Sequence, residues 1–350
     1  MLSTGCRLGT YFAKTRCCCC FLNTQMTVSC DIDSLNEMAA TSGWDCLYQQ
    51  MRPGRLAARS TFRQVGQSFL LREQVSHSVQ FRGAPSSSLV AFMLVSQHQG
   101  ARIAGTDPGT ADLWFIPPGY DLSMISGDVV DIWTISIPLV ALTSNQTQED
   151  SERTIVRQSA PRPLPLSRQD RANLMSRIGA CLAVPSDESM LAILEQVLID
   201  TLRELLRQRN DTSGLESNRQ HRCHKRLLQV IDHLNAQHHR LVSVPEMASI
   251  AGLTERTLRR YFREHFDLSP LQYDRARRLN CARRMLANGS TINGTITEAA
   301  LDAGFEQLGR FSRDFRGLFG VSPSVFVAEN ARKTKSVGET GLFHDHWHPI

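Results

Sequence analysis

Hydrophobic and polar residues follow two different patterns along the chain. Between about residues 60 and 140, apolar residues alternate with polar ones or form short runs, as in SFLLREQVSHSVQF, SSLVAFMLVSQ, ADLWFIPPGYDLSMI and VVDIWTISIPL. Clusters rich in Gly, Pro, Ser and Asp, such as RGAPSSS and GTDPGT, separate these runs. Short apolar runs between turn signals predict an antiparallel β-sandwich or barrel.

The pattern then becomes helical. Ser167 is suited to cap a helix over SRQDRANLMSRIGACLAV. The next segment, SMLAILEQVLIDTLRELLRQ, predicts a helix with leucines on one stripe: Leu191, Leu194, Leu198, Leu202 and Leu205. Such a stripe packs either on its own domain or on a second copy of the chain, and the pattern leaves both open. The polar segment 207–220 has no aromatic residue and predicts a linker that isolates the C-terminal part of the chain.

Two stretches near the C-terminus are near copies, FREHFDLSPLQY from Phe262 and FRGLFGVSPSVF from Phe315. The similarity extends upstream, so each copy predicts a helix-turn-helix unit, at about 244–265 and 296–318. Gly252 and Gly304 are expected to end the first helix of each unit in the left-handed conformation. Thr254 and Gly309 are the expected N-caps of the second helices.

Helical spacing divides each second helix into an apolar face and a basic face. In the first copy it turns Arg256, Arg259 and Arg260 outward; in the second it turns out Arg310, Ser312 and Arg313. Side chains on the first turns of a recognition helix reach base edges in the major groove, and Arg is the commonest reader of guanine. Arg263 and Arg316 lie further along and suit phosphates. The helix between the copies is expected to expose five arginines, Arg275, Arg277, Arg278, Arg283 and Arg284.

Charge strengthens this interpretation. From His221 to Lys333 there are 16 Arg and 2 Lys against 11 acidic residues, a balance of +7. The rest of the chain carries 21 basic and 23 acidic residues, a balance of −2. Basic charge concentrated on a repeated helical unit favours DNA as the partner, whereas charge alone would equally fit a solvated surface.

The positions of the cysteines and the hydropathy of the chain indicate the cellular compartment of the protein. Six of the ten cysteines lie in the first 30 residues, and five of these lie in residues 1–25, a segment that makes a poor signal peptide and that we expect to be a disordered leader. The remaining cysteines are isolated, as is typical of a reducing cytoplasm. No apolar run approaches the ~18 residues of a membrane helix, so no membrane partner is expected.

Residues 240–326, with these two units, resemble the DNA-binding domain of the AraC/XylS family of bacterial transcription regulators. The motif GFEQLGRFSRDFRGLFGVSPS is especially similar to its XylS and BenR branch. The resemblance implies seven helices with two helix-turn-helix units, an activator that recruits RNA polymerase, a bacterial nucleoid location and a homodimer. It adds Leu308 to the base-reading positions. One departure is Asp267, where the family has glycine; Asp tolerates the left-handed region better than most residues.

The N-terminal half resembles the sensor domain of that branch more weakly, through ADLWFIPPGYDLSM. The branch is associated with aromatic carboxylates and related small molecules, so a small-molecule effector is implied. Two other interpretations stay open: an architectural DNA-binding protein without a sensor role, and a cupin-type metalloenzyme. The second lacks the His-x-His pattern that such metal sites use, since His77 and His98 are 21 residues apart. No catalytic residue, metal ligand or cofactor is expected.

The sequence therefore predicts an α+β protein with a β-rich, cupin-like sensor domain and an all-α domain with two helix-turn-helix units. The expected organisation is a leader at 1–25, a ligand-sensing and dimerisation domain at 26–206 and a linker at 207–220. The DNA-binding domain comes next, at 221–333, with a flexible tail at 334–350. The function expected is sequence-specific binding to double-stranded promoter DNA, with regulation of transcription and no enzymatic activity.

Overall fold

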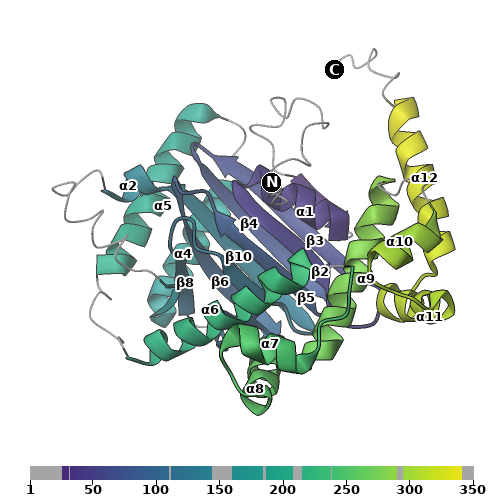
Figure 1. Ribbon diagram of the computed structural model, residues 1–350. Helices are drawn as coiled ribbons and strands as arrows, with labels where there is room; N and C mark the ends of the chain where they lie inside the picture. The colour runs from purple at the N-terminus through teal and green to yellow at the C-terminus, as the bar shows by residue number, and fades with distance from the viewer. Residues whose placement is uncertain are drawn as a thin grey trace, which may run out of the picture.

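The computed structural model describes residues 26–30, 32–109, 112–143, 160–183, 187–207, 215–237, 239–289 and 295–340. The predicted leader and residues 341–350 lie outside these ranges. Strands fill the N-terminal half and helices the C-terminal half (Figure 1). This arrangement confirms the α+β expectation.

Two antiparallel sheets form the N-terminal half. The larger has seven strands in the order β1-β3-β4-β10-β6-β8-β11, and the smaller has four in the order β2-β5-β9-β7. The strand bounds are β1 Met26–Cys30, β2 Trp44–Gln50, β3 Ala57–Val65, β4 Ser68–Ser76, β5 Val79–Pro85, β6 Leu89–Gln99, β7 Arg102–Ile103, β8 Asp112–Ile116, β9 Leu122–Ile125, β10 Val129–Pro138 and β11 Arg162–Pro165.

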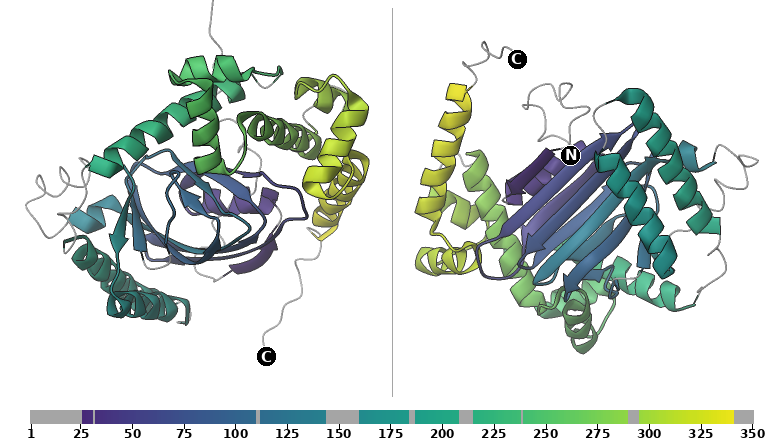
Figure 2. Two further views of the ribbon diagram at one scale, coloured as in Figure 1. Left: turned by 90° about the horizontal axis from the view of Figure 1, so that it is seen from below. Right: turned by 180° about the vertical axis from the view of Figure 1, so that it is seen from behind.

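Alternation along the central strands fills two cores, one on each face of the larger sheet. On β6, Met93 and Val95 face the smaller sheet, whereas Phe92 and Leu94 face the helices α4 (Arg168–Ala183) and α5 (Glu188–Arg207). Figure 2 shows these two helices lying against the sheet in the view from behind. Burial on both faces explains why LVAFMLV is a continuous apolar run. Two short helices, α1 (Ile32–Thr41) and α2 (Leu139–Thr143), complete this half.

The leucine stripe of α5 belongs to its own domain. Leu191, Leu198, Leu202 and Leu205 are buried in the core beneath the larger sheet, and Leu194 packs against it. The stripe therefore cannot also form the interface with a second copy. Ser167 caps α4 as predicted, because its hydroxyl accepts a hydrogen bond from the Asp170 amide.

From Leu215 on, the described residues form seven helices, the number implied by the family resemblance. They are α6 Leu215–Ala236, α7 Val244–Ala251, α8 Glu255–Phe266, α9 Pro270–Asn288, α10 Ile296–Asp302, α11 Leu308–Phe319 and α12 Pro323–Thr340. Helix α6 begins within the segment predicted as a linker, and α12 continues past residue 334, where a tail was predicted. No described helix is long and apolar enough to span a membrane.

The two halves share an interface, which the predicted linker did not lead us to expect. Helix α9 lies along β2, an edge strand of the smaller sheet. Asn280 accepts a hydrogen bond from the Gln50 amide at 3.0 Å and donates one to the Gln50 carbonyl at 2.7 Å. The Tyr273 hydroxyl donates to Gln80 at 2.7 Å, and Arg283 pairs with Asp33 at 2.8 Å. One helix thus satisfies backbone groups that a sheet edge would otherwise expose.

Candidate nucleic-acid interface

The first helix-turn-helix unit, α7 and α8, has the helix end at Gly252 and the N-cap at Thr254 that the sequence predicts. The Ser243 hydroxyl caps α7 by accepting from the Glu246 amide, and Gly252 ends the helix with φ of 60°. Thr254 caps α8 by accepting from the Thr257 amide. Asp267 ends α8 in the left-handed region, with φ of 54°. The local sequence therefore fixes both helices and the turn between them.

The second unit, α10 and α11, differs from the prediction at one cap. Thr295 and Glu298 form a capping box at the start of α10, and Gly304 follows the helix with φ of 76°. A Cβ on Gly304 would lie 2.9 Å from the His239 carbonyl oxygen, so the position has no room for a side chain. Helix α11 begins at Leu308 after Gln307, which makes no side-chain cap. The prediction of Gly309 as the N-cap was wrong, because Gly309 lies within the first turn.

The inward faces of both recognition helices are apolar as predicted, except that α8 also buries His265. Leu258, Phe262 and Phe266 of α8 are buried, and Tyr261 is half-buried beside them. The corresponding residues of α11, all buried, are Phe311, Phe315, Leu318 and Phe319. These side chains, together with α9, hold each recognition helix by its inner face.

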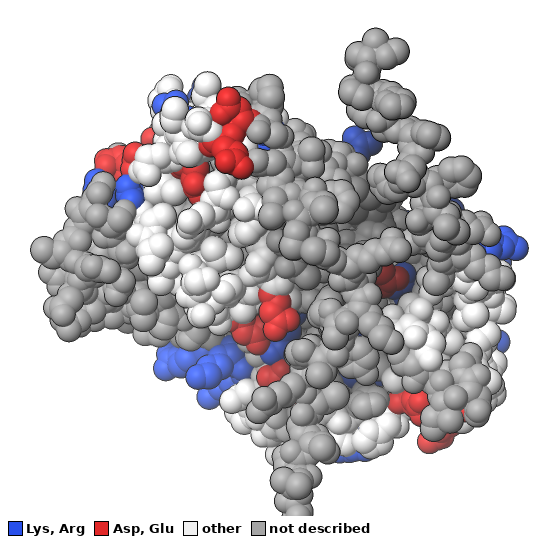
Figure 3. All heavy atoms as spheres, turned by 90° about the horizontal axis from the view of Figure 1, so that it is seen from above, with Lys and Arg blue, Asp and Glu red and all other residues white. Residues whose placement is uncertain are grey.

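The outward faces carry every predicted DNA-contacting residue. All nine are exposed, including Leu308 with 41% of its surface accessible: Arg256, Arg259, Arg260, Arg263, Leu308, Arg310, Ser312, Arg313 and Arg316. The face of the molecule seen from above carries small groups of both charge signs (Figure 3), not one continuous basic surface. Exposed arginines also occur on α4, at Arg168 and Arg177, so those of α8 and α11 are distinguished by their position on the two recognition helices.

The two helices hold their arginines differently. On α8, Arg259 pairs with Glu255 at 3.0 Å and Arg260 with Glu264 at 3.6 Å. No ion pair within the described part of the chain involves Arg310, Arg313 or Arg316 of α11. The basic face of α11 is thus available to an anion without breaking an internal pair, whereas α8 must release two.

Three arginines of α9 were predicted to be exposed and are buried. Arg277 and Arg278 both pair with Asp274, which is fully buried, at 2.7 Å and 3.1 Å. Arg283 is the third, buried against α1 and stacked on Phe326 of α12. Neighbouring elements cover these sides of α9, and a carboxylate or an aromatic ring compensates each charge.

Comparison with known proteins agrees with this geometry. A helix-turn-helix domain family matches residues 247–329. The XylDLEGF operon transcriptional activator 2 of Pseudomonas putida is 36% identical over 120 residues, covering 34% of this chain and 74% of the relative. The chain belongs to the AraC/XylS family. It is therefore a DNA-binding transcription regulator.

Two further relatives of this AraC/XylS regulator span different shares of the chain. The HTH-type transcriptional regulator CdhR of Pseudomonas aeruginosa is 25% identical over 249 residues, covering 69% of this chain and 67% of CdhR. An AraC-type regulator of known structure from Chromobacterium violaceum covers 31% of this chain and 94% of its own, at 27% identity and a TM-score of 0.29.

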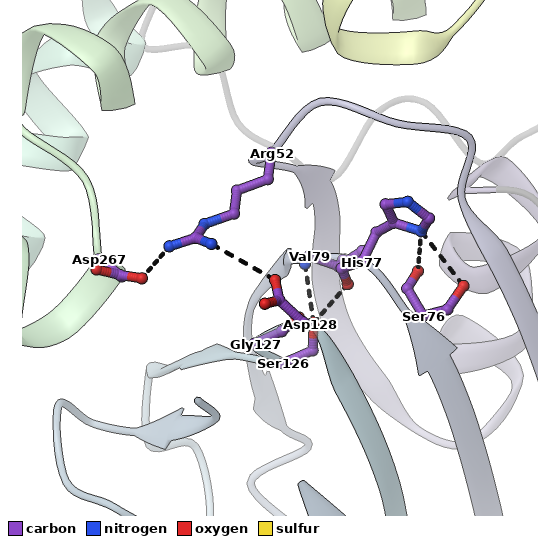
Figure 4. Close-up of polar contacts among 8 residues, drawn as sticks. All are labelled: Arg52, Ser76, His77, Val79, Ser126, Gly127, Asp128 and Asp267. Carbon is purple, nitrogen blue, oxygen red and sulfur yellow. Dashed lines mark hydrogen bonds and ion pairs between the residues drawn. The ribbon is translucent and has the colours of Figure 1, made fainter. Parts of the chain in front are cut away.

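In this AraC/XylS regulator, the loop after β2 contacts the C-terminal ends of both recognition helices. The Gly54 amide donates to the Leu318 carbonyl of α11 at 3.1 Å, and the Gln50 side chain donates to the same oxygen at 2.6 Å. Arg52 forms an ion pair with Asp267 at the end of α8 and a longer one, 3.5 Å, with Asp128 (Figure 4). The N-terminal half of the regulator thus contacts both units through one short loop.

Neither the loop contacts nor the buried charges of α9 followed from the sequence of this regulator. Residues 50–54 carry no repeat or motif, and their partners in the C-terminal half lie more than 200 positions away. A buried acid in the N-terminal half, Glu73, did leave a signal, because it occupies the inward position between Leu71 and Val75 in an alternating strand. A charged residue at such a position indicates a site and not packing alone.

Proposed function

We propose that the regulator reads promoter DNA with α8 and α11 as two unlike heads and activates transcription in response to a small molecule. The observation that carries the proposal is the exposure of all nine predicted contact residues on these two helices. Two recognition helices on one rigid unit suit successive major grooves, about 34 Å apart. Arg256, Arg259, Arg260, Leu308, Arg310, Ser312 and Arg313 read bases, and Arg263 and Arg316 bind phosphates.

The remaining roles extend this proposal. Residues 26–206 sense the effector and mediate dimerisation, 207–220 link the halves, and 221–333 bind DNA. The protein acts in the bacterial cytoplasm, on the nucleoid, as a homodimer that recruits RNA polymerase, and catalysis has no part in its function. Since the leucine stripe is buried, the apolar side chains of α5 left for a second copy are Met190 and Ile193, which are 46% and 60% exposed. The effector binds in the cavity between the two sheets.

An experiment on the full chain tests the division between base readers and phosphate anchors. The cognate site is first selected from genomic fragments pulled down by the protein. Arg259→Ala and Arg313→Ala are each expected to cost about 1–3 kcal/mol on that site and to relax preference at one or two base pairs. Arg316→Ala should weaken binding to all sequences alike and lower the slope of log K against log salt by about one.

The matched control is Arg168→Ala, which removes an exposed arginine from α4 in the sensor half. It should leave DNA affinity unchanged. If the three substitutions on α8 and α11 weaken specific and non-specific binding in equal proportion, the assignment of base readers is wrong. If they behave like the control, neither helix binds DNA. A protein that binds its site with no response to any small molecule would favour the architectural alternative.

A further inference from the structure

The cavity between the two sheets has a lining that limits the chemistry of its ligand. This inference rests on the proposed role of the cavity as the effector site. Strands of both sheets line the cavity, and its polar lining residues are Ser42, Tyr48, Glu73, Ser126 and Thr134, together with the indole of Trp44. Apolar side chains, including Met93 and Met124, make up the rest. Among the described residues, no arginine, lysine or histidine lines it.

Glu73 is the charged group of this lining. It lies on β4 and is 7% exposed. The Tyr48 hydroxyl, 2.8 Å and 2.9 Å from the two carboxylate oxygens, donates one hydrogen bond to the carboxyl group. No ion pair within the described ranges involves Glu73. Burial raises the pKa of Glu73 to about 7, and the hydrogen bond from Tyr48 lowers it in part. The carboxylate thus has no cationic partner among the described residues. A positively charged ligand would supply one.

Three aromatic rings lie beside this acid. Phe81 makes edge-to-face contacts with Trp44, at 5.3 Å between ring centroids, and with Tyr48, at 5.2 Å. The faces of such rings attract cations, with most effect where water is excluded. A buried carboxylate with aromatic neighbours therefore favours a positively charged group and opposes a carboxylate.

We propose that the effector of this regulator is an organic cation, an ammonium group carried on an apolar body. The ammonium pairs with Glu73, and the apolar body lies among Trp44, Phe81 and the two methionines. This assignment departs from the aromatic carboxylates that the family resemblance implied, since a ligand carboxylate would face Glu73 with no cation to balance either charge.

The size of the cavity adds a consequence for regulation. The free space in the cavity is about 30 Å³, close to the volume of one water in the liquid. A larger ligand must move the side chains of Met93 and Met124, which are flexible enough to repack. Ser126 also lines the cavity and lies two residues before Asp128, the partner of Arg52 (Figure 4). Opening the cavity therefore acts close to the loop that contacts both recognition helices.

The test compares three ligands with one ring and different charge. Full-length protein labelled with ¹³C at the methionine methyl groups is titrated at about pH 8 with benzylamine, benzyl alcohol and benzoate. Met93→Leu and Met124→Leu assign the two signals that report on the cavity. Benzylamine is expected to bind roughly tenfold or more tightly than benzyl alcohol, because it gains the Glu73 and aromatic contacts, and benzoate should bind most weakly.

Two controls separate charge from shape. Glu73→Gln keeps the volume and a hydrogen-bond acceptor, so it should abolish the preference for benzylamine and leave benzyl alcohol unchanged. If that variant does not fold, the same question is answered with the unmutated protein by changing the pH. Lowering the pH to about 6 protonates Glu73 and should weaken benzylamine about tenfold, with little effect on benzyl alcohol. Tyr48 and Cys46, both on β2, are the titratable neighbours of Glu73 in the described part of the chain, and burial raises the pKa of Cys46 far above this range.

Each outcome decides the inference. Tightest binding of benzoate, equal affinities for all three ligands, or an unchanged preference in Glu73→Gln would overturn the cationic effector. Such results would leave a cavity that senses some other molecule, so the proposed function would survive. Absence of any shift at Met93 and Met124 would also overturn the inference. Binding of the same samples to the cognate DNA is measured in parallel, and it tests the proposed DNA-binding function separately from the identity of the effector.

Discussion

The two helix-turn-helix units share a pattern of buried residues, yet they pack against α9 through different kinds of interaction. The first unit meets α9 through aromatic rings: Tyr273 lies 5.4 Å from Phe262 and 4.7 Å from Phe266, between centroids. The second adds arginines to its apolar contacts. Arg278 donates to the Gly304 carbonyl at 2.8 Å and stacks on Phe305 at 4.6 Å, and Arg275 pairs with Asp314.

The difference shows that two units of similar sequence can be stabilised by different interactions with the same helix. Apolar contacts tolerate small shifts, whereas a buried charge depends on keeping its partner. Asp274 is the partner of Arg277 and Arg278, and Arg278 in turn holds the second unit. The first unit has no such dependence among its described contacts with α9. Loss of one carboxylate should therefore affect the two units unequally.

The largest expected effect is that of Asp274→Asn. It leaves two buried arginines without a negative partner, so we expect a loss of about 3–5 kcal/mol in the free energy of unfolding, measured by urea denaturation. Amide protection should fall more in α10 and α11 than in α7 and α8. Asp302→Asn, on the exposed side of α10, is the matched control and should change stability by less than about 0.5 kcal/mol. Equal loss of protection in both units would remove the comparison.

A second prediction uses pH to act on the first unit alone. His265 of α8 and Leu318 of α11 occupy equivalent positions, 53 residues apart, and both are buried. His265 packs against Gly105 of the N-terminal half, and its ring lies 6.3 Å from that of His224. Burial lowers the pKa of His265 to about 4, although a hydrogen bond to the Tyr261 carbonyl opposes this.

The sign of the effect follows from the proton count. Between about pH 6.5 and pH 4 the unfolded chain binds a proton at this residue and the native protein does not, so stability falls as pH falls. From pH 7 to pH 5 the loss should be about 2 kcal/mol. His265→Leu introduces the residue found in the second unit and should abolish this part of the pH dependence. Identical unfolding curves for both proteins over this range would contradict the burial of a neutral imidazole.

How much the sequence could predict depends on how local each feature is. The caps at Ser243, Thr254 and Ser269 follow from residues within one turn, and all form as their side chains allow. The exposed face of α8 follows from helical period alone. The start of α11 was predicted two residues too late, because its N-cap position is Gln307, the counterpart of Thr254 at a spacing of 53, and Gln307 makes no side-chain cap that would mark it in the sequence.

Features that depend on distant elements were out of reach. Arg277 and Arg283 were placed on an exposed face because they are charged, but that face is covered by other parts of the chain. Period and composition describe one element at a time, whereas burial depends on which elements meet. The role of Asn280 at the edge of β2 is of the same kind, since it exists only once α9 lies along that strand.

The smallest expected effect concerns the contact between Arg52 and Asp267, which the second unit lacks. In place of that ion pair, the second unit offers the Leu318 carbonyl to Gly54 and Gln50. The side chains of Arg52 and Asp267 are 36% and 64% exposed, so solvent screens their attraction. A double-mutant cycle with Arg52→Gln and Asp267→Asn should give a coupling energy below about 1 kcal/mol in urea denaturation. Asparagine is the suitable replacement, because it also tolerates the left-handed backbone of residue 267.

Raising the salt concentration should reduce the coupling energy between Arg52 and Asp267 further. The control is Gln50→Ala, which removes a neutral donor to the second unit, and its effect on stability should not depend on salt. A coupling energy well above 1 kcal/mol that resists salt would contradict this prediction and mean that the ion pair holds the first unit firmly to the N-terminal half.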